Sequence, residues 1–284
     1  MVINMKIKKV LNNNAVTVIN NHNQEVVVMG LGLAFKKRAG DELEEEKIER
    51  IFTLENKEIS EKLKELISEI PMKHVEVCEE IVKYSEEHLD KKLNENIYLT
   101  LTDHISFALA RHEKGLDMKN PMAWEIKRFY KQEYSIAIKA LEIIKEKLQV
   151  DLPQDEAASI ALHIVNAQLN IDMNNVIDIT NIIQGILSTI KYHFGIGLDE
   201  DSLNYHRLIT HLKFFAQRML NDKLPKNDDD YLYHIVKEKY SDAYNCAERI
   251  KIYIKKTYEF TITNEEMTYL IVHIQRVVNR DSDK

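Results

Sequence analysis

Two segments of the chain repeat a histidine, a phenylalanine and an arginine at the same spacing. They are LTDHISFALAR and LITHLKFFAQR, and the repeated residues are His104, Phe107 and Arg111, then His211, Phe214 and Arg218. Imidazole is a nucleophile near neutral pH, and a residue seven positions further on lies on roughly the same face of a helix. The spacing therefore suits a histidine that accepts a phosphoryl group beside an arginine that pairs with an anion.

A second histidine follows in each copy of this pattern. Aligning DEAASIALHI with EEMTYLIVHI places Glu156 over Glu266 and His163 over His273. The two histidines of a copy are 59 residues apart in the first copy and 62 in the second. Changes in loop length explain a drift of that size. The sequence therefore predicts two helical domains of one kind, with a boundary near residues 170–175.

Other uses of these histidines match the sequence less well. None of the four forms an i, i+4 pair with a second metal ligand, as in the HExxH motif of zinc enzymes. The chain has no G-x-S-x-G, P-loop or paired-carboxylate motif. A single histidine on a half-apolar helix is most often a core or interface residue, and either arginine also suits a solvated helix end or a carboxylate across an interface. The repetition of the whole pattern favours phosphoryl acceptance.

Upstream of the repeats, the sequence predicts strands. Segments of β-branched or alternating residues lie at 5–12, 15–20, 25–30, 33–38 and 50–54. From Ile59 onward, apolar residues recur at helical spacing. The expected fold class is therefore α+β and multidomain: a small antiparallel β domain followed by two homologous all-α helical-bundle domains. A β domain of about 55 residues has only a small core, so we expect it to dimerise.

Charge and composition indicate a cytosolic protein with an anionic partner. The first 40 residues carry +5 although the whole chain carries −7, and their charged residues are Lys6, Lys8, Lys9, Lys36, Lys37 and Arg38 against Glu25. The two cysteines, Cys78 and Cys246, are far apart and are expected to be buried thiols. No apolar run approaches the roughly 20 residues that span a bilayer, and the N-terminus lacks the apolar core of a signal peptide.

Taken in order, these segments resemble a known family. KIKKVLNNNAVTVINN and VVVMGLGLAFKKRAGD are similar to the co-antiterminator (CAT) RNA-binding domain of the BglG/LicT/SacY family of bacterial transcriptional antiterminators. The two histidine repeats resemble the two phosphotransferase-system (PTS) regulation domains of that family. The resemblance runs from Met5 to about Arg280. It implies a CAT domain at 1–59 and regulation domains at 60–171 and 172–284.

The resemblance also implies a function for the four histidines. Members of the family bind, as homodimers, an RNA hairpin in a leader transcript, and this prevents formation of an overlapping terminator. By the family's scheme, the sugar-specific permease (enzyme II) phosphorylates His104 and His163, which inactivates the protein. The phosphocarrier HPr phosphorylates His211 and His273, which activates it, with Arg111 and Arg218 as supports for phosphate or an interface. The protein is then a phosphoryl acceptor, and not an enzyme, with no cofactor and no metal.

The family pattern maps RNA contacts onto Lys9, Asn14, Gly30, Gly32 and Phe35. Lysine neutralises phosphate, asparagine reads a base edge, glycine allows close approach of the backbone, and phenylalanine stacks on a base. The structural alternatives are a core position for Phe35 and a simple bend at the two glycines. Some members carry arginine where this chain has Leu31, so their preference for RNA sequence does not transfer.

Two other functions fit the sequence less well than antitermination. Regulation domains of this type also occur on DNA-binding activators, but helix-turn-helix modules need consecutive helices where this chain predicts strands. A phosphocarrier that passes phosphate onward leaves the basic N-terminal end without a role. The residues do not name the sugar, but the overall resemblance favours a β-glucoside operon over a sucrose operon as the target. The sequence leaves open whether translation starts at Met1 or Met5.

Overall fold

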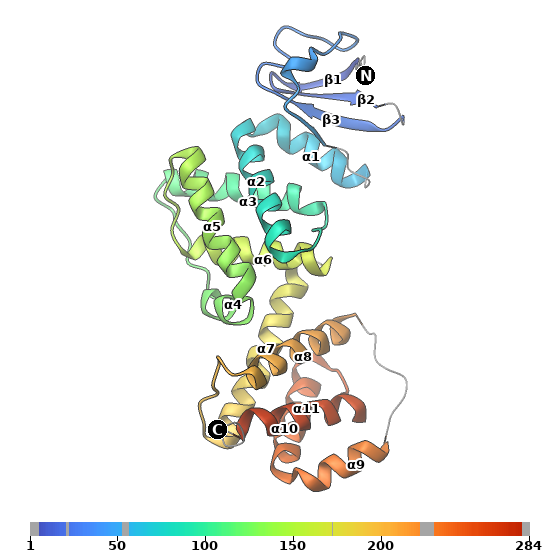
Figure 1. Cartoon of the computed structure of the whole chain (residues 1–284), viewed down its shortest axis with the longest axis vertical. Coiled ribbons are helices and arrows are strands. Elements are labelled where there is room, and N and C mark those ends of the chain that lie inside the picture. Colours follow the sequence, from blue (N-terminus) through green and yellow to red (C-terminus); the bar gives the residue numbers. More distant parts are fainter. Residues whose placement is uncertain (1–5, 21–22, 53–56, 172, 222–229, 280–284) are drawn as a thin grey trace. The chain divides into compact units, whose positions relative to one another are not determined.

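A small β-sheet precedes a long series of helices in the chain (Figure 1). The structure is a computed structural model that describes residues 6–20, 23–52, 57–171, 173–221 and 230–279. It divides into two compact units, Met1–Asn170 and Ile171–Lys284. The expected α+β fold, with an antiparallel sheet first and helical domains after it, is confirmed. None of the helices in the described ranges is long and apolar enough to cross a membrane.

The sheet of the first unit has antiparallel neighbours throughout, in the order β1-β2-β3-β4. The strands are β1 (Ile7–Asn12), β2 (Ala15–Ile19), β3 (Glu25–Met29) and β4 (Arg50–Phe52). One face forms a cluster with the loop after β3, made of Ile7, Val16, Val18, Val26, Val28, Leu33 and Ala34. The other face carries Ala15, Val27, Met29 and Phe52. Because both faces are covered, consecutive residues are buried at 15–18 in β2 and at 26–29 in β3, rather than every second one.

The predicted strand at 33–38 is wrong. The N–H of Leu33 donates to the carbonyl of Gly30 at 3.1 Å, and the N–H of Phe35 donates to that of Gly32 at 3.1 Å, so this segment forms successive turns. Gly32 and Lys36 have φ values of 65° and 60°, in the left-handed region that no strand uses. The apolar residues of the segment fold back onto the sheet, whereas Phe35 stays 61% exposed. Of the other predicted strands, residues 5, 53 and 54 lie outside the described ranges.

Helices make up the rest of the first unit. They are α1 (Lys57–Glu69), α2 (Met72–Leu89), α3 (Asn96–Glu113), α4 (Ala123–Phe129), α5 (Lys131–Leu148) and α6 (Asp155–Leu169), after a short 3-10 turn η1 (Glu45–Lys47). α2 packs against α3 and α5, and α3 and α5 pack against α6. Cys78 on α2 is a buried free thiol, in line with its expected place in the core.

The second unit repeats the end of the first. Its helices are α7 (Met173–Phe194), α8 (Leu203–Leu220), α9 (Asp230–Lys239), α10 (Ser241–Tyr258) and α11 (Asn264–Val278). Tyr130 precedes α5 and Gln149 follows it, just as Tyr240 precedes α10 and Glu259 follows it. Both tyrosines have φ of −123°, and both end residues are left-handed, with φ of 59° and 57°. The same backbone features therefore recur 110 residues apart, as a duplicated domain requires.

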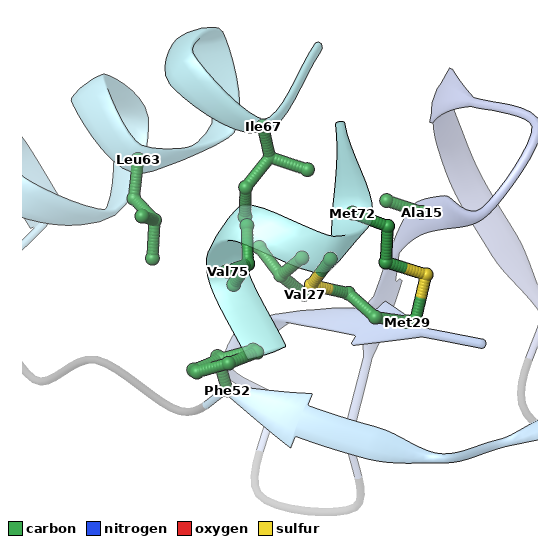
Figure 2. Close-up of a cluster of buried hydrophobic side chains, with 8 residues drawn as sticks. All are labelled: Ala15, Val27, Met29, Phe52, Leu63, Ile67, Met72 and Val75. Atoms are coloured by element: carbon green, nitrogen blue, oxygen red, sulfur yellow. The ribbon is translucent and has the colours of Figure 1, made fainter. Parts of the chain in front are cut away.

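A cluster joins the sheet to the first two helices (Figure 2). It consists of Ala15, Val27, Met29 and Phe52 from the sheet, Leu63 and Ile67 from α1, and Met72 and Val75 from α2. Two polar contacts border it. Lys64 Nζ, on a side chain only 7% exposed, lies 3.2 Å from Glu25 Oε1, and Asn12 Nδ2 donates to the Ile67 carbonyl at 2.7 Å. Both apolar burial and directed polar contacts therefore hold α1 against the sheet.

The contact between α1 and the sheet should weaken in acid. Burial by itself raises the pKa of Glu25, but the contacts with the ammonium groups of Lys8 and Lys64 outweigh it and lower the pKa to about 2. A pKa lowered by folding stabilises the folded state above the ordinary value of 4.5, and that stability is lost as the pH falls from there toward 2. We therefore expect Glu25→Gln to remove part of the acid sensitivity of the contact between α1 and the sheet.

Urea unfolding of the full chain at pH 7 and pH 3.5 measures this, followed by the NMR methyl signals of Val27 and Ile67. The midpoint of the native protein should fall more between the two pH values than that of Glu25→Gln. Glu46→Gln is the matched control, because Glu46 is exposed. Equal pH dependence of the native protein and Glu25→Gln contradicts the prediction.

Candidate functional site

The two repeated histidines of the first unit meet between α3 and α6. The ring centroids of His104 on α3 and His163 on α6 are 5.0 Å apart. Glu156, near the start of α6, places Oε2 3.0 Å from His104 Nε2. Its other oxygen, Oε1, accepts a hydrogen bond from Arg111 Nη2 at 2.7 Å. The residues that the sequence repeats therefore form one cluster around a carboxylate.

Helical periodicity explains why these side chains share one place. α3 turns its apolar face to the core through Ile97, Leu101, Ile105 and Ala108. This leaves His104 and Arg111, seven residues apart, along the edge of that face. On α6, Glu156 and His163 are also seven residues apart. Because α3 packs against α6, the two pairs meet across the helix contact.

The second unit has the same cluster between α8 and α11. The rings of His211 and His273 stack with centroids 5.0 Å apart. Arg218 donates to Glu266 Oε1 from Nε at 2.8 Å, and its Nη2 lies 2.6 Å from the same oxygen. The contact between histidine and carboxylate is looser here, because His211 Nε2 lies 3.8 Å from Glu266 Oε2. The two clusters therefore share their parts but differ in how tightly histidine and glutamate meet.

Burial lowers the pKa of three histidines of the two clusters, which favours their neutral form. It lowers the pKa of His163 to about 3, with a further contribution from the charge of His104. It lowers the pKa of His211 to about 3 as well, assisted by the charges of His273 and Arg218. The pKa of His273 is also lowered, again mainly by burial. A neutral imidazole has the free electron pair that a phosphoryl acceptor needs.

The two carboxylates differ in charge preference. Burial works to raise the pKa of Glu156, but the nearby His104 and Arg111 bring it below its ordinary value. Burial raises the pKa of Glu266, and the hydrogen bond from Arg218 only partly offsets this. The longer distance to histidine in the second cluster accounts for the difference, since Arg218 is the close charged partner of Glu266 among the described residues.

Glu156 and Glu266 are the residues that sequence reasoning missed. Both are nearly fully buried, with 3% and 1% of their surface exposed. Their signal was present in the alignment of the repeats, where an acidic residue precedes each second histidine by seven positions. Each arginine pairs with a carboxylate of its own domain, an arrangement that the sequence did not suggest. No group of three or more residues suited to hold a metal ion occurs within the described ranges.

The predicted RNA contacts lie on the first unit, and the structure brings some of them together. Asn14, in the turn between β1 and β2, accepts a hydrogen bond at Oδ1 from the N–H of Gly32 at 2.8 Å. Its own N–H donates to Asn12 Oδ1 at 2.8 Å. Phe35 lies exposed on the same loop as Gly32, and Lys9 is exposed on β1. Asn14 therefore holds this loop through its oxygen, which leaves its amide N–H groups for another partner.

Gly30 has a packing role of its own. A Cβ at this position would lie 1.7 Å from the carbonyl oxygen of Lys47. Gly32 differs, because a Cβ there meets nothing within 4 Å, but its φ of 65° is left-handed. Leu31, between them, is 75% exposed. The bend at the two glycines is therefore required by the fold, and it presents Leu31 and Phe35 to solvent.

Known proteins match the chain over most of its length. The model of the CAT RNA-binding domain family matches residues 5–61, and the model of the PRD domain family matches residues 79–167 and 184–277. The transcription antiterminator LicT of Bacillus subtilis (strain 168) is 53% identical over 276 residues, which cover 97% of this chain and 100% of that protein. The beta-glucoside operon antiterminator of Dickeya chrysanthemi is 46% identical, with 96% of each chain covered.

This chain belongs to the family of transcription antiterminators built from a CAT RNA-binding domain and PRD domains. A solved structure, the CAT-PRDI part of GlcT, superposes with a TM-score of 0.50 at 35% identity and covers 58% of this chain and 98% of its own. The resemblance seen in the sequence is thereby confirmed. Each histidine cluster lies within one of the two PRD matches, and the predicted RNA contacts lie within the CAT match.

Proposed function

We propose that this protein binds, as a dimer, an RNA hairpin in a leader transcript and prevents formation of a terminator, under the control of four phosphorylated histidines. The observation that carries the proposal is the duplicated cluster of two histidines, an arginine and a buried glutamate, in a chain that begins with a CAT domain. The N-terminal part of the chain forms the sheet of β1 to β4, whereas a DNA-binding activator would need consecutive helices there. The structure therefore does not favour a DNA-binding activator.

The clusters supply a physical reason for a response to phosphate. A phosphoryl group adds about −1.5 to −2 charges and three acceptor oxygens. On His104 or His211 it would stand beside the buried carboxylate of Glu156 or Glu266, which repels it, and beside the arginine, which binds it. Each cluster is thus expected to exchange an arginine–glutamate pair for an arginine–phosphate pair, and the helix contact must adjust.

Two donors with opposite effects complete the proposal. HPr phosphorylates His211 and His273 and activates the protein, and the sugar-specific permease phosphorylates His104 and His163 and inactivates it. The name of the Dickeya chrysanthemi relative supports a β-glucoside operon as the target. Sucrose is the second candidate. The site of action is the cytoplasm, where leader transcripts are made.

Mass spectrometry of the protein after incubation with phosphorylated HPr tests the assignment of sites. Phosphate should appear on His211 and His273, at neutral to alkaline pH where phosphohistidine survives. It should be missing from the six histidines outside the repeat that the prediction excludes, which are His74, His88, His112, His193, His206 and His234. Modification mainly at those six refutes the proposed sites.

The RNA-binding surface is tested by two substitutions that should differ in kind. Lys9→Ala should weaken cognate and random RNA alike and reduce the salt dependence of binding, because lysine contacts phosphate. Asn14→Ala should weaken cognate RNA by about 1–3 kcal/mol more than random RNA, because its amide reads a base edge. Gel shifts of the full chain at several salt concentrations measure both.

Asn14 also holds Gly32, so its loop needs a control. Asn13→Ala changes an exposed neighbour in the same turn and should leave RNA affinity near that of the native protein. Amide NMR signals of Gly32 and Phe35 report whether Asn14→Ala displaces the loop. Equal losses for cognate and random RNA with an intact loop contradict a role for Asn14 in sequence recognition.

A further inference from the structure

The leading histidine of each cluster has one ring nitrogen that is shut off from solvent. Nε2 of His104 and Nε2 of His211 are both buried, and each faces an oxygen of a buried glutamate at 3.0 Å and 3.8 Å respectively. Among the described residues, neither nitrogen has an aligned hydrogen-bond partner, and neither has the facing oxygen of Glu156 or Glu266. The same two unsatisfied atoms thus face each other in both domains.

Buried polar atoms without a partner are costly, and a pair that recurs in two copies calls for a common reason. A proton on Nε2 of His104 faces the Glu156 oxygen at 3.0 Å, where a small rotation of the ring aligns a hydrogen bond and gives both atoms a partner. His211 and Glu266 are 3.8 Å apart, which is longer than a hydrogen bond, so in the second domain the proton on Nε2 is favoured by the charge of the facing carboxylate. The proton then cannot be on Nδ1, so that Nδ1 carries the free electron pair. A donor protein also cannot reach Nε2 unless the cluster opens.

We propose that Glu156 and Glu266 are positioning residues that hold the leading histidine of each domain through Nε2 and so direct the phosphoryl group to Nδ1. This inference rests on the proposed function, because it concerns the same phosphorylation. It goes further by naming the accepting atom and the residue that selects it.

The transfer balances without any other reactant. For His211, the Nδ1 electron pair attacks the phosphorus of a phosphohistidine on the donor protein, and the N–P bond of the donor breaks. The donor imidazole leaves as a neutral ring with its electron pair restored. The acceptor ring keeps its proton on Nε2 and becomes a positively charged imidazolium with phosphate on Nδ1. The facing carboxylate stabilises this positive charge, in the way that a buried carboxylate supports an imidazolium in other proteins.

The second histidine of the first cluster should behave differently. In His163, Nδ1 is the buried nitrogen without an aligned partner among the described residues. Its ring lies against the His104 ring, with centroids 5.0 Å apart, and no carboxylate accepts a hydrogen bond from this nitrogen in the part of the chain that the structure describes. We therefore expect phosphate on Nε2 of His163, so that the two histidines of this cluster carry it on different nitrogens.

NMR of the full chain labelled with 15N-histidine tests the proposal in two independent steps. In the unphosphorylated protein, long-range 1H–15N correlation should show His104 and His211 with the proton on Nε2. A proton on Nδ1 of either ring overturns the proposal, whether or not any donor phosphorylates the protein. After incubation with phosphorylated HPr at alkaline pH, 31P–15N coupling should place the phosphate of His211 on Nδ1, and phosphate on Nε2 also overturns it.

Substitution separates positioning from packing. Glu266→Gln keeps the size of the side chain but removes the charge that stabilises the imidazolium, so the rate of phosphorylation of His211 should fall about tenfold or more. Glu265→Gln removes the same charge one residue away and should leave the rate within about twofold of the native rate. Glu266→Asp should restore part of the rate.

Loss of the fold is distinguished by the NMR spectrum of His273, which lies in the same cluster and should keep its signals in Glu266→Gln. A native rate in Glu266→Gln with an intact spectrum overturns the role of the carboxylate. Phosphate found only on histidines outside the clusters would instead refute the proposed function, and the protonated nitrogen of His211 would still decide the present proposal.

Discussion

His211→Asp combined with His273→Asp should raise antitermination without HPr, whereas His104→Asp combined with His163→Asp should lower it. The opposite sign of the two effects is the expected result. Aspartate supplies negative charge at the place of the phosphate, although it lacks the size and the three acceptor oxygens of a phosphoryl group. The mimic should therefore act in the right direction but incompletely.

The charged residues of each cluster explain how the added aspartate acts. In the second domain, a carboxylate at position 211 would stand near Glu266, whose pKa burial already raises, and the two negative charges would repel each other. Arg218 on α8 can then pair with the new carboxylate in place of Glu266 on α11. Because the pair between Arg218 and Glu266 joins the two helices, the contact between α8 and α11 should shift. Moving a two-state equilibrium from 1:99 to 99:1 takes about 5.5 kcal/mol, which several charge-assisted contacts in a dimer supply together.

A terminator-reporter assay and sedimentation of the purified variants measure both arms. The variant of the second domain should form a tighter dimer with higher reporter activity, and that of the first domain a weaker dimer with lower activity. His104→Ala with His163→Ala should give expression without the sugar, since the permease then has no site to modify. If both double-aspartate variants change activity in the same direction, the proposal of two opposed inputs is wrong.

Gly30→Ala should unfold or strongly destabilise the RNA-binding domain. The added Cβ would lie 1.7 Å from the carbonyl oxygen of Lys47. Gly30 is also held on both sides, because its N–H donates to the Asn14 carbonyl and its carbonyl accepts from the N–H of Leu33. The clashing atom belongs to the backbone and cannot move aside as a side-chain end can. We therefore expect the substitution to lower the free energy of unfolding by more than the roughly 1–3 kcal/mol that overpacking usually costs. A small domain has little stability to spare.

Loss of the sheet is read from amide NMR and urea unfolding of the full chain without RNA, which separates folding from any contact of Gly30 with RNA. Gly32→Asn is the matched control two residues away. A Cβ at position 32 meets nothing within 4 Å, and asparagine tolerates the left-handed φ of 65° better than most residues. A native-like unfolding midpoint for Gly30→Ala contradicts the close approach of Lys47.

Local patterns in the sequence were sufficient for the elements and their repetition. Runs of β-branched residues predicted β2 and β3, and the spacing of apolar residues predicted the helices, because strand and helix periods depend on neighbours along the chain. The four repeated histidines and their arginines could be paired by alignment of the chain with itself. The pattern of LAFKKR led to a wrong strand prediction. Leu33 and Ala34 are apolar because they pack on the sheet from a turn, and they are not part of a strand.

Only the tertiary structure showed which side chains meet. Glu156 lies 45 residues from Arg111 along the chain, and Glu266 lies 48 from Arg218, so no local pattern links them. Burial of each carboxylate, its distance from the histidine and the nitrogen that it faces depend on the packing of α3 on α6 and of α8 on α11. Three further features also depend on contacts between distant segments. They are the hydrogen bond from Gly32 to Asn14, the close approach of the Lys47 carbonyl to Gly30, and the packing of α1 on the sheet. Contacts between distant segments decide them, because a charge or a packed atom acts through space and not along the sequence.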